Sequence, residues 1–290
     1  MLFSRVAGHL RPDHTDTILL SATLLESMER LELAAATYAK VPRDDPSFHA
    51  AELGRAEALR KLDRLDTAEE VLTQLARTHG SLPIVHVSLG DLMRQMERFD
   101  DAVRAYDWAL VLYDAPDANQ WFIYYARAIA YERQDSWPEA EADFRMALEL
   151  NPDQPQVLNY LGYSLVEQRV KLDEALDMIE RAVAARPDSG YIVDSLGWVL
   201  YRLGRYEEAI IHMERAAELM PVDPIVNDHL GDVLWAVGRT REARFQWTRA
   251  LSFDPEEEDA ARIRRKLEVG LDVVLEEEGA KPLSQVANGN

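Results

Sequence analysis

The chain of 290 residues contains no cysteine, so disulfides, thiolate zinc sites and cysteine nucleophiles are excluded. Basic residues are scarce: 32 lysines and arginines stand against 52 acidic residues, which gives a formal net charge of −20. A surface with that excess repels phosphate backbones and anionic lipids, so we expect no nucleic-acid partner. No stretch approaches the roughly 20 apolar residues that a membrane helix needs, so we expect no direct membrane insertion.

Catalytic and ligand-binding patterns are missing as well. The sequence has no GxSxG, GxxxxGK, GxGxxG or HExxH pattern, and its seven histidines show no metal-ligand spacing. Acidic pairs such as Glu207-Glu208 fall on expected solvent faces of helices, where charged residues are ordinarily found. We therefore predict a protein that is not an enzyme and that holds neither a cofactor nor a metal.

What the sequence does contain is a repeat of about 34 residues. Leu-Gly pairs recur at Leu89-Gly90, Leu161-Gly162, Leu196-Gly197 and Leu230-Gly231, and an alanine follows each glycine by 12 or 13 residues. Seven such alanines are spaced by 34, 34, 38, 35, 34 and 34 residues: Ala34, Ala68, Ala102, Ala140, Ala175, Ala209 and Ala243. A large apolar residue stands four residues after each of them, and a proline closes five of the repeats.

Each repeat is predicted to form two helices, because apolar residues recur at helical period in both of its halves. Gly204 and Gly238 stand where a first helix must end, which suits a left-handed cap. Asp223-Pro224 and Asp254-Pro255 each predict an N-cap residue followed by proline at the first helical position.

Leu-Gly, then Ala-x3-aromatic, then Pro resembles the tetratricopeptide repeat (TPR) over about residues 15–257. The resemblance implies an all-α fold, a right-handed TPR α-solenoid of about seven helix-turn-helix repeats. Extra residues near 113–120 predict a longer loop, or a break, after the third repeat. Residues 258–278 are expected to form one continuous C-terminal capping helix, and residues 279–290 a disordered tail.

Residues 1–14 resemble the second helix of a further repeat whose first helix is missing. They form either a short cap, or the start of a fragment cut from a longer array. As it stands the chain would be cytoplasmic. However, residues 161–209 resemble the C-terminal part of bacterial TPR proteins exported to the periplasm, some of which are lipoprotein adaptors that present substrates to processing proteases. If the chain is a fragment of such a protein, the resemblance implies a periplasmic location.

The first helices of such a solenoid line its concave groove, and the resemblance places groove residues at positions 2, 5, 9, 12 and 13 of each repeat. In the C-terminal repeats these positions combine aromatic rings with acids. The expected partner-binding residues are Tyr125, Arg133, Asn159, Tyr163, Tyr191, Asp194, Trp198, Tyr201, Asp228, Asp232 and Trp235.

Aromatic anchors are typical of peptide-binding surfaces, and Asp194, Asp228 and Asp232 would be available to pair with lysine or arginine of a ligand. We therefore predict a non-catalytic scaffold or adaptor that binds a protein or peptide segment, apolar with some basic character. For Tyr163 and Trp198 the alternative is packing between neighbouring first helices. An alternative function is a structural homo-oligomer that pairs through the N-terminal helix.

Overall fold

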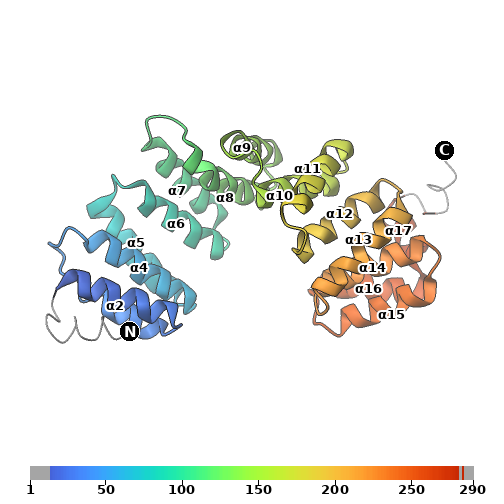
Figure 1. The fold of residues 1–290 in the computed structure, drawn as a ribbon, viewed down its shortest axis with the longest axis horizontal. Helices are drawn as coiled ribbons and strands as arrows, with labels where there is room; N and C mark the ends of the chain where they lie inside the picture. Colours follow the sequence, from blue (N-terminus) through green and yellow to red (C-terminus); the bar gives the residue numbers. More distant parts are fainter. Residues whose placement is uncertain (1–13, 281–282, 284–290) are drawn as a thin grey trace. The chain divides into compact units, whose positions relative to one another are not determined.

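The computed structural model describes residues 14–280 and 283, and within that part of the chain all regular structure is helical (Figure 1). The chain folds into two compact units, Met1–Asn151 and Pro152–Asn290. The predictions for residues 1–13, and for most of the tail after residue 279, lie outside the described residues.

The N-terminal unit consists of four helical hairpins, which we number repeats 1 to 4. They are α2 (Thr15–Ser27) with α3 (Leu31–Tyr38), α4 (Phe48–Lys61) with α5 (Leu65–His79), α6 (Pro83–Gln95) with α7 (Phe99–Val111), and α8 (Trp121–Glu132) with α9 (Trp137–Leu150). Within this unit each first helix also contacts the first helix of the next repeat.

The C-terminal unit continues with repeats 5 to 7 and two further helices. The hairpins are α10 (Pro155–Glu167) with α11 (Leu172–Ala185), α12 (Gly190–Arg202) with α13 (Tyr206–Leu219), and α14 (Pro224–Ala236) with α15 (Thr240–Leu251), followed by α16 (Glu257–Val269) and α17 (Leu271–Glu277). The expected all-α fold of seven helical hairpins is confirmed, with four hairpins in the first unit and three in the second. Positions within a repeat are counted below from Thr15, His49, Pro83, Trp121, Pro155, Gly190 and Pro224.

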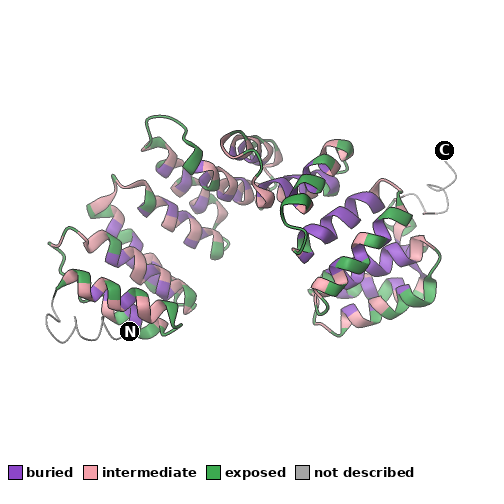
Figure 2. Ribbon diagram, viewed as in Figure 1, coloured by how far each residue is buried: buried purple, intermediate pink, exposed green. Residues whose placement is uncertain are grey.

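One contact recurs in the core of the repeats. Four residues after each of the seven repeat alanines stands a large side chain that is at most 5% exposed: Tyr38, Leu72, Tyr106, Phe144, Ile179, Met213 and Trp247. In several repeats it lies against a glycine at position 8 of its own first helix, as Tyr106 does on Gly90 and Trp247 on Gly231. The small residue therefore sets how closely the two helices approach, and Figure 2 shows the buried residues along α12 and α14 that result.

The turn between the two helices of a repeat uses a left-handed residue at position 15. Gly204 and Gly238 adopt φ of 76° and 80°, which confirms the predicted caps. The five earlier repeats place a non-glycine residue at this position, with φ of 57° or 58°: Glu29, Asp63, Glu97, Asp135 and Arg169. The turn therefore requires a left-handed residue at position 15 whether or not that residue is glycine.

Two helix starts were predicted from Asp-Pro pairs, and one is confirmed. The Asp223 carboxylate accepts a hydrogen bond from the Val226 N–H at 3.0 Å, as an N-cap does. The prediction for Asp254 is wrong, because this residue adopts a left-handed conformation (φ 53°) and α16 begins only at Glu257.

The C-terminal capping helix is not continuous, so that prediction is also wrong. Gly270 separates α16 from α17 with φ of 89° and ψ of 160°, a conformation that favours glycine. A Cβ atom at this position would lie 2.8 Å from the ring of Trp235, so the break lets the backbone pass directly over that indole.

The longer loop expected near residues 113–120 is present and ends in a 3₁₀ turn, η1 (Ala118–Gln120). Gln120 is buried there, and its side-chain amide donates to the Ala115 carbonyl at 3.3 Å. The boundary between the two compact units falls after Asn151 instead, at the end of repeat 4. Within the described ranges, no helix combines the length and the apolar character needed to cross a bilayer.

The position 8 contact predicts unequal responses at two equivalent glycines. Gly231→Ala would drive a methyl group into the rigid indole of Trp247, so we expect unfolding of the C-terminal unit to become easier by about 1–3 kcal/mol. Gly197→Ala, one repeat earlier, meets the flexible Met213 side chain at 2.8 Å and should cost less. Urea unfolding of both variants tests the difference, and equal losses would contradict it.

Candidate functional site

Aromatic rings from α12 and α14 pack together in the C-terminal unit. The ring of Trp198 stacks on His229 with centroids 4.0 Å apart and on Tyr201 at 4.9 Å. The Trp198 Nε1 atom donates to Glu167 of α10 at 2.8 Å, and the residue is only 7% exposed. The packing alternative considered for Trp198 therefore holds: the ring lies between neighbouring first helices.

The three groove aspartates are satisfied within the chain. Asp194 Oδ2 lies 3.0 Å from Nδ1 of His229, and both side chains are buried. Asp228 and Asp232 both pair with Lys266 of α16, each through a closest N–O distance of 2.7 Å. The expectation that these acids face the cations of a ligand is therefore wrong, because the cation is supplied by the chain itself.

Lys266 is completely buried, which is tolerable for an ammonium group only when it is paired and hydrogen-bonded. The Trp247 indole adds to the same cluster by donating to Asp232 Oδ1 at 2.9 Å. Lys266 was missed by sequence reasoning. The signal for it was the pair of acids four residues apart on α14, a helix otherwise rich in apolar residues, because buried acids at that spacing require a partner cation.

A cavity of about 540 Å³ lies beside this cluster, between the first helices α10, α12 and α14 and the capping helices α16 and α17. Its lining brings together Tyr163, Trp198, Tyr201 and Asp228 from the predicted set. Three further lining residues, Glu167, Arg202 and Ile225, stand at groove positions 13, 13 and 2 of their repeats, although they were not among the expected partner-binding residues. Sequence reasoning did not select the rest: Arg169, Leu172, Tyr206, His229, Asp259, Arg262, Leu275, Glu278, Ala280 and Leu283.

Several polar groups on the cavity wall lack hydrogen bonds to any described residue. Arg202 makes an ion pair with Glu167 at 3.8 Å and lies over the Trp198 ring at 5.9 Å, but its guanidinium donates no hydrogen bond within residues 14–280. The hydroxyls of Tyr163 and Tyr201 likewise have no such partner there. Burial raises the pKa of both tyrosines, so these hydroxyls stay protonated and able to donate.

The remaining predicted residues do not line this cavity. Trp235 donates to Asp272 of α17 at 2.9 Å and packs on Trp247, so the cap covers it. Tyr191 is 46% exposed on α12, and Asn159 is buried with no hydrogen-bond partner for its Oδ1 among the described residues. Two more predicted residues belong to the N-terminal unit: Tyr125 beside Phe144, and Arg133 over the ring of Phe99.

No group of three or more histidine, aspartate or glutamate side chains is arranged to hold a metal ion in the described part of the chain.

The buried Lys266 yields a stability prediction. Lys266→Met removes the buried ammonium from two buried carboxylates and leaves them only the longer ion pairs with Arg262, at 3.8 Å from Asp228 and 3.6 Å from Asp232. We therefore expect a loss of about 3–5 kcal/mol in the unfolding free energy of the C-terminal unit. The adjacent Arg265 makes only exposed ion pairs, with Glu268 and Glu277, and Arg265→Met should change the free energy little. Chemical denaturation of both variants tests this, and similar losses would refute it.

His229 makes stability depend on pH. Burial alone lowers the pKa of His229, but the carboxylates of Asp194, Asp228 and Asp232 outweigh it and raise the pKa above its usual value. Protonated His229 therefore stabilises the fold fully below about pH 6.5, and this contribution is lost as the pH rises through the folded pKa.

We expect the unfolding free energy of the C-terminal unit to fall above about pH 6.5, by up to roughly 1.4 kcal/mol per pH unit. Asp194→Asn removes the nearest charge and should flatten this fall. His212→Gln serves as the control. Burial lowers the pKa of His212, so its effect on the pH dependence of the unfolding free energy has the opposite sign to that of His229. Urea titrations between pH 6 and 8 measure the slope, and a slope unchanged in Asp194→Asn would count against the assignment.

Comparison with known proteins agrees with the hairpin geometry. A segment of 81 residues is 35% identical to a TPR repeat-containing protein of Pseudomonas aeruginosa, covering 28% of this chain and 14% of that relative. The fold resembles a tetratricopeptide repeat protein from Parabacteroides merdae (16% identity, TM-score 0.66, covering 88% of this chain and 98% of the other). It also resembles YrrB, described as a TPR protein with an unusual peptide-binding site (21% identity, TM-score 0.51, covering 68% and 99%).

The tetratricopeptide repeat profile matches residues 19–83, 87–155, 125–190 and 161–224, which together make up more than half of the chain. Repeats of this kind form scaffolds for protein–protein interaction. The chain has seven helical hairpins, and in several of them a glycine packs against a large side chain. With a profile match over most of its length, the chain belongs to the tetratricopeptide repeat family.

Proposed function

We propose that this chain is a non-catalytic scaffold that holds a segment of a partner protein in the cavity of its C-terminal unit. The observation that carries the proposal is the cavity of about 540 Å³, whose walls combine aromatic rings with a guanidinium that donates no hydrogen bond within the described residues. Its size falls within the roughly 300–1,000 Å³ of ligand pockets. The peptide-binding site named for YrrB is consistent with such a role on this fold.

The groups that make no hydrogen bond to the described residues indicate the chemistry of the partner. Because Lys266, Arg262 and His229 pair with the three groove aspartates, the basis for a basic ligand is removed. Arg202 and the hydroxyls of Tyr163 and Tyr201 instead offer hydrogen-bond donors beside apolar surface. We infer a segment with an apolar or aromatic side chain next to a carbonyl or carboxylate acceptor.

Two earlier predictions remain open beside this proposal. The homo-oligomer alternative depends on residues 1–13, which lie outside the described part of the chain. A periplasmic location remains a prediction from resemblance alone.

The proposal predicts that cavity variants lose peptide affinity without losing the fold. Peptides are selected from a random library displayed on phage against the immobilised chain, and their dissociation constants are measured by fluorescence anisotropy. Arg202→Ala and Tyr163→Phe should each weaken binding about tenfold or more, since each removes a donor that a ligand acceptor would use. Circular dichroism should remain that of the wild type.

Arg205→Ala is the matched control, because Arg205 lies three residues away and pairs with the exposed Glu208 instead of lining the cavity. Its affinity should equal that of the wild type. If the library yields no binders, or if selected peptides bind Arg202→Ala as tightly as the wild type, the cavity is not the binding site.

A further inference from the structure

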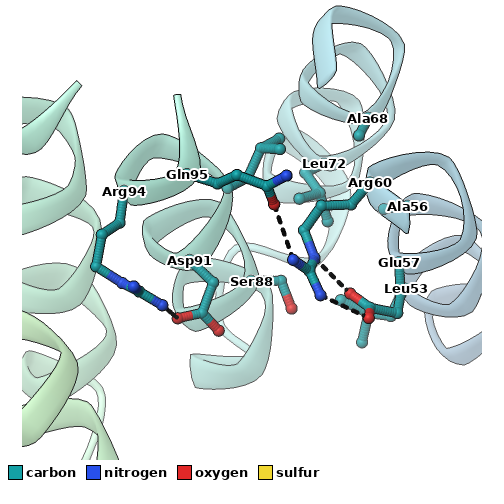
Figure 3. A pocket seen from close by; sticks show the side chains of 11 residues that line it. Leu53, Ala56, Glu57, Arg60, Ala68, Leu72, Ser88, Asp91, Arg94 and Gln95 are labelled. Atoms are coloured by element: carbon teal, nitrogen blue, oxygen red, sulfur yellow. Dashed lines mark hydrogen bonds and ion pairs between the residues drawn. The ribbon is translucent and has the colours of Figure 1, made fainter. Parts of the chain in front are cut away.

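A second cavity, of about 370 Å³, lies in the N-terminal unit between repeats 2 and 3. Its floor is apolar and buried, with Ala56, Leu72 and Leu92 each at most 3% exposed. Figure 3 shows Arg60 of α4 extending to Gln95 of α6 at its mouth, with Ser88 between the two helices. No part of the proposed function uses this cavity.

The cavity lies where other repeats place an aromatic ring. Leu72 is the core residue of repeat 2 four positions after Ala68, and Tyr38 in repeat 1 and Tyr106 in repeat 3 are its equivalents. The Tyr38 ring lies against Gly54, at position 6 of repeat 2. The corresponding neighbour of Leu72 is Ser88, at position 6 of repeat 3, and both residues line the cavity. Because leucine is shorter than tyrosine, the space that a ring fills in repeat 1 is empty in repeat 2.

The rings in the other repeats also share a polar contact. In three repeats the ring donates to, or shares a hydrogen bond with, position 9 of its own first helix: Tyr38 with Thr23 at 3.2 Å, Tyr106 with Asp91 at 2.7 Å, and Trp247 with Asp232 at 2.9 Å. Position 9 of repeat 2 is Glu57, which lines the cavity. Repeat 2 therefore keeps the acceptor while lacking the ring that would donate to it.

Glu57 is able to accept a further hydrogen bond. Its two carboxylate oxygens accept from Nε and Nη2 of Arg60 at 2.8 Å each, and a carboxylate has about four acceptor positions. Hydrogen bonding to Arg60 lowers the pKa of Glu57, so the carboxylate is charged at neutral pH. The side chains of Glu57 and Arg60 are 38% and 35% exposed, so the cavity is open to solvent on this side.

We propose that this cavity binds a tyrosine side chain of a partner protein, whose ring fills the space left by Leu72 and whose hydroxyl donates to Glu57. Arg60 at the mouth is placed to lie over the inserted ring, as Arg133 lies over Phe99 at 5.5 Å within the same unit. The site is independent of the cavity in the C-terminal unit, and neither proposal requires the other.

The test uses the full chain labelled with ¹³C at leucine methyl groups and three blocked pentapeptides: Ala-Ala-Tyr-Ala-Ala, its phenylalanine analogue and penta-alanine. The tyrosine peptide should shift the methyl resonances of Leu53, Leu72 and Leu92. The phenylalanine peptide should bind at least about tenfold more weakly than the tyrosine peptide, because it lacks the hydroxyl donor. Penta-alanine should cause no shifts.

Leu72→Tyr combined with Ser88→Gly copies the Tyr38–Gly54 pair and fills the cavity from within. This variant should melt at or above the wild-type temperature and give no peptide-induced shifts. Glu57→Met removes the acceptor and keeps a side chain of similar length, so the tyrosine and phenylalanine peptides should then bind nearly equally. This variant tests the site even if the double variant fails to fold.

Absence of shifts in the wild type at millimolar tyrosine peptide would overturn the proposal. So would tyrosine binding that persists in the folded double variant, or a preference for tyrosine over phenylalanine that survives Glu57→Met. Arg202→Ala serves as a control and should leave these shifts unchanged, which separates this site from the C-terminal cavity.

Discussion

The architecture depends on a contact that recurs in repeats 3, 5, 6 and 7, in which a large side chain of the second helix packs against a glycine at position 8 of the first helix. This contact fixes the separation of the two helices, because any added atom at position 8 meets the large side chain. It also fixes which sides of the first helix turn inward. Where the large side chain carries a donor, as in Tyr106 and Trp247, position 9 supplies the acceptor, so packing and polar pairing are specified together.

Differences among repeats arise from local exceptions to that contact. In repeat 2 the large side chain is leucine, and a cavity lies beside it. In repeats 6 and 7 the corresponding surface is filled by the stack of Trp198 on His229. A common backbone plan therefore presents different chemistry along its length, which is how one fold serves unrelated partners.

The end of the stack imposes a different constraint. Helix α14 is the first helix of repeat 7, and its two acids, Asp228 and Asp232, lie on the side that the first helix of a following repeat would cover. No further repeat follows it among the described residues. Lys266 and Arg262 of α16 pair with both acids, and Asp272 of α17 accepts from Trp235. The cap thereby affects the neighbouring cavity, because it pairs with the acids of α14, while Arg202 and two tyrosine hydroxyls make no hydrogen bond to the described residues.

The sequence by itself determined the all-α class, the seven hairpins, the core alanines and the left-handed caps at Gly204 and Gly238. These features follow from residue spacing along one helix or one turn, so they need no knowledge of distant neighbours. Tertiary structure alone decided that Asp228 and Asp232 face Lys266, that Trp235 is covered, and that Gly270 breaks the cap. The position of Asp228 or Asp232 in its repeat shows which way the side chain points. Its partner Lys266 lies 34 or more residues away in the sequence, so only the packed chain brings the carboxylates and the ammonium group together.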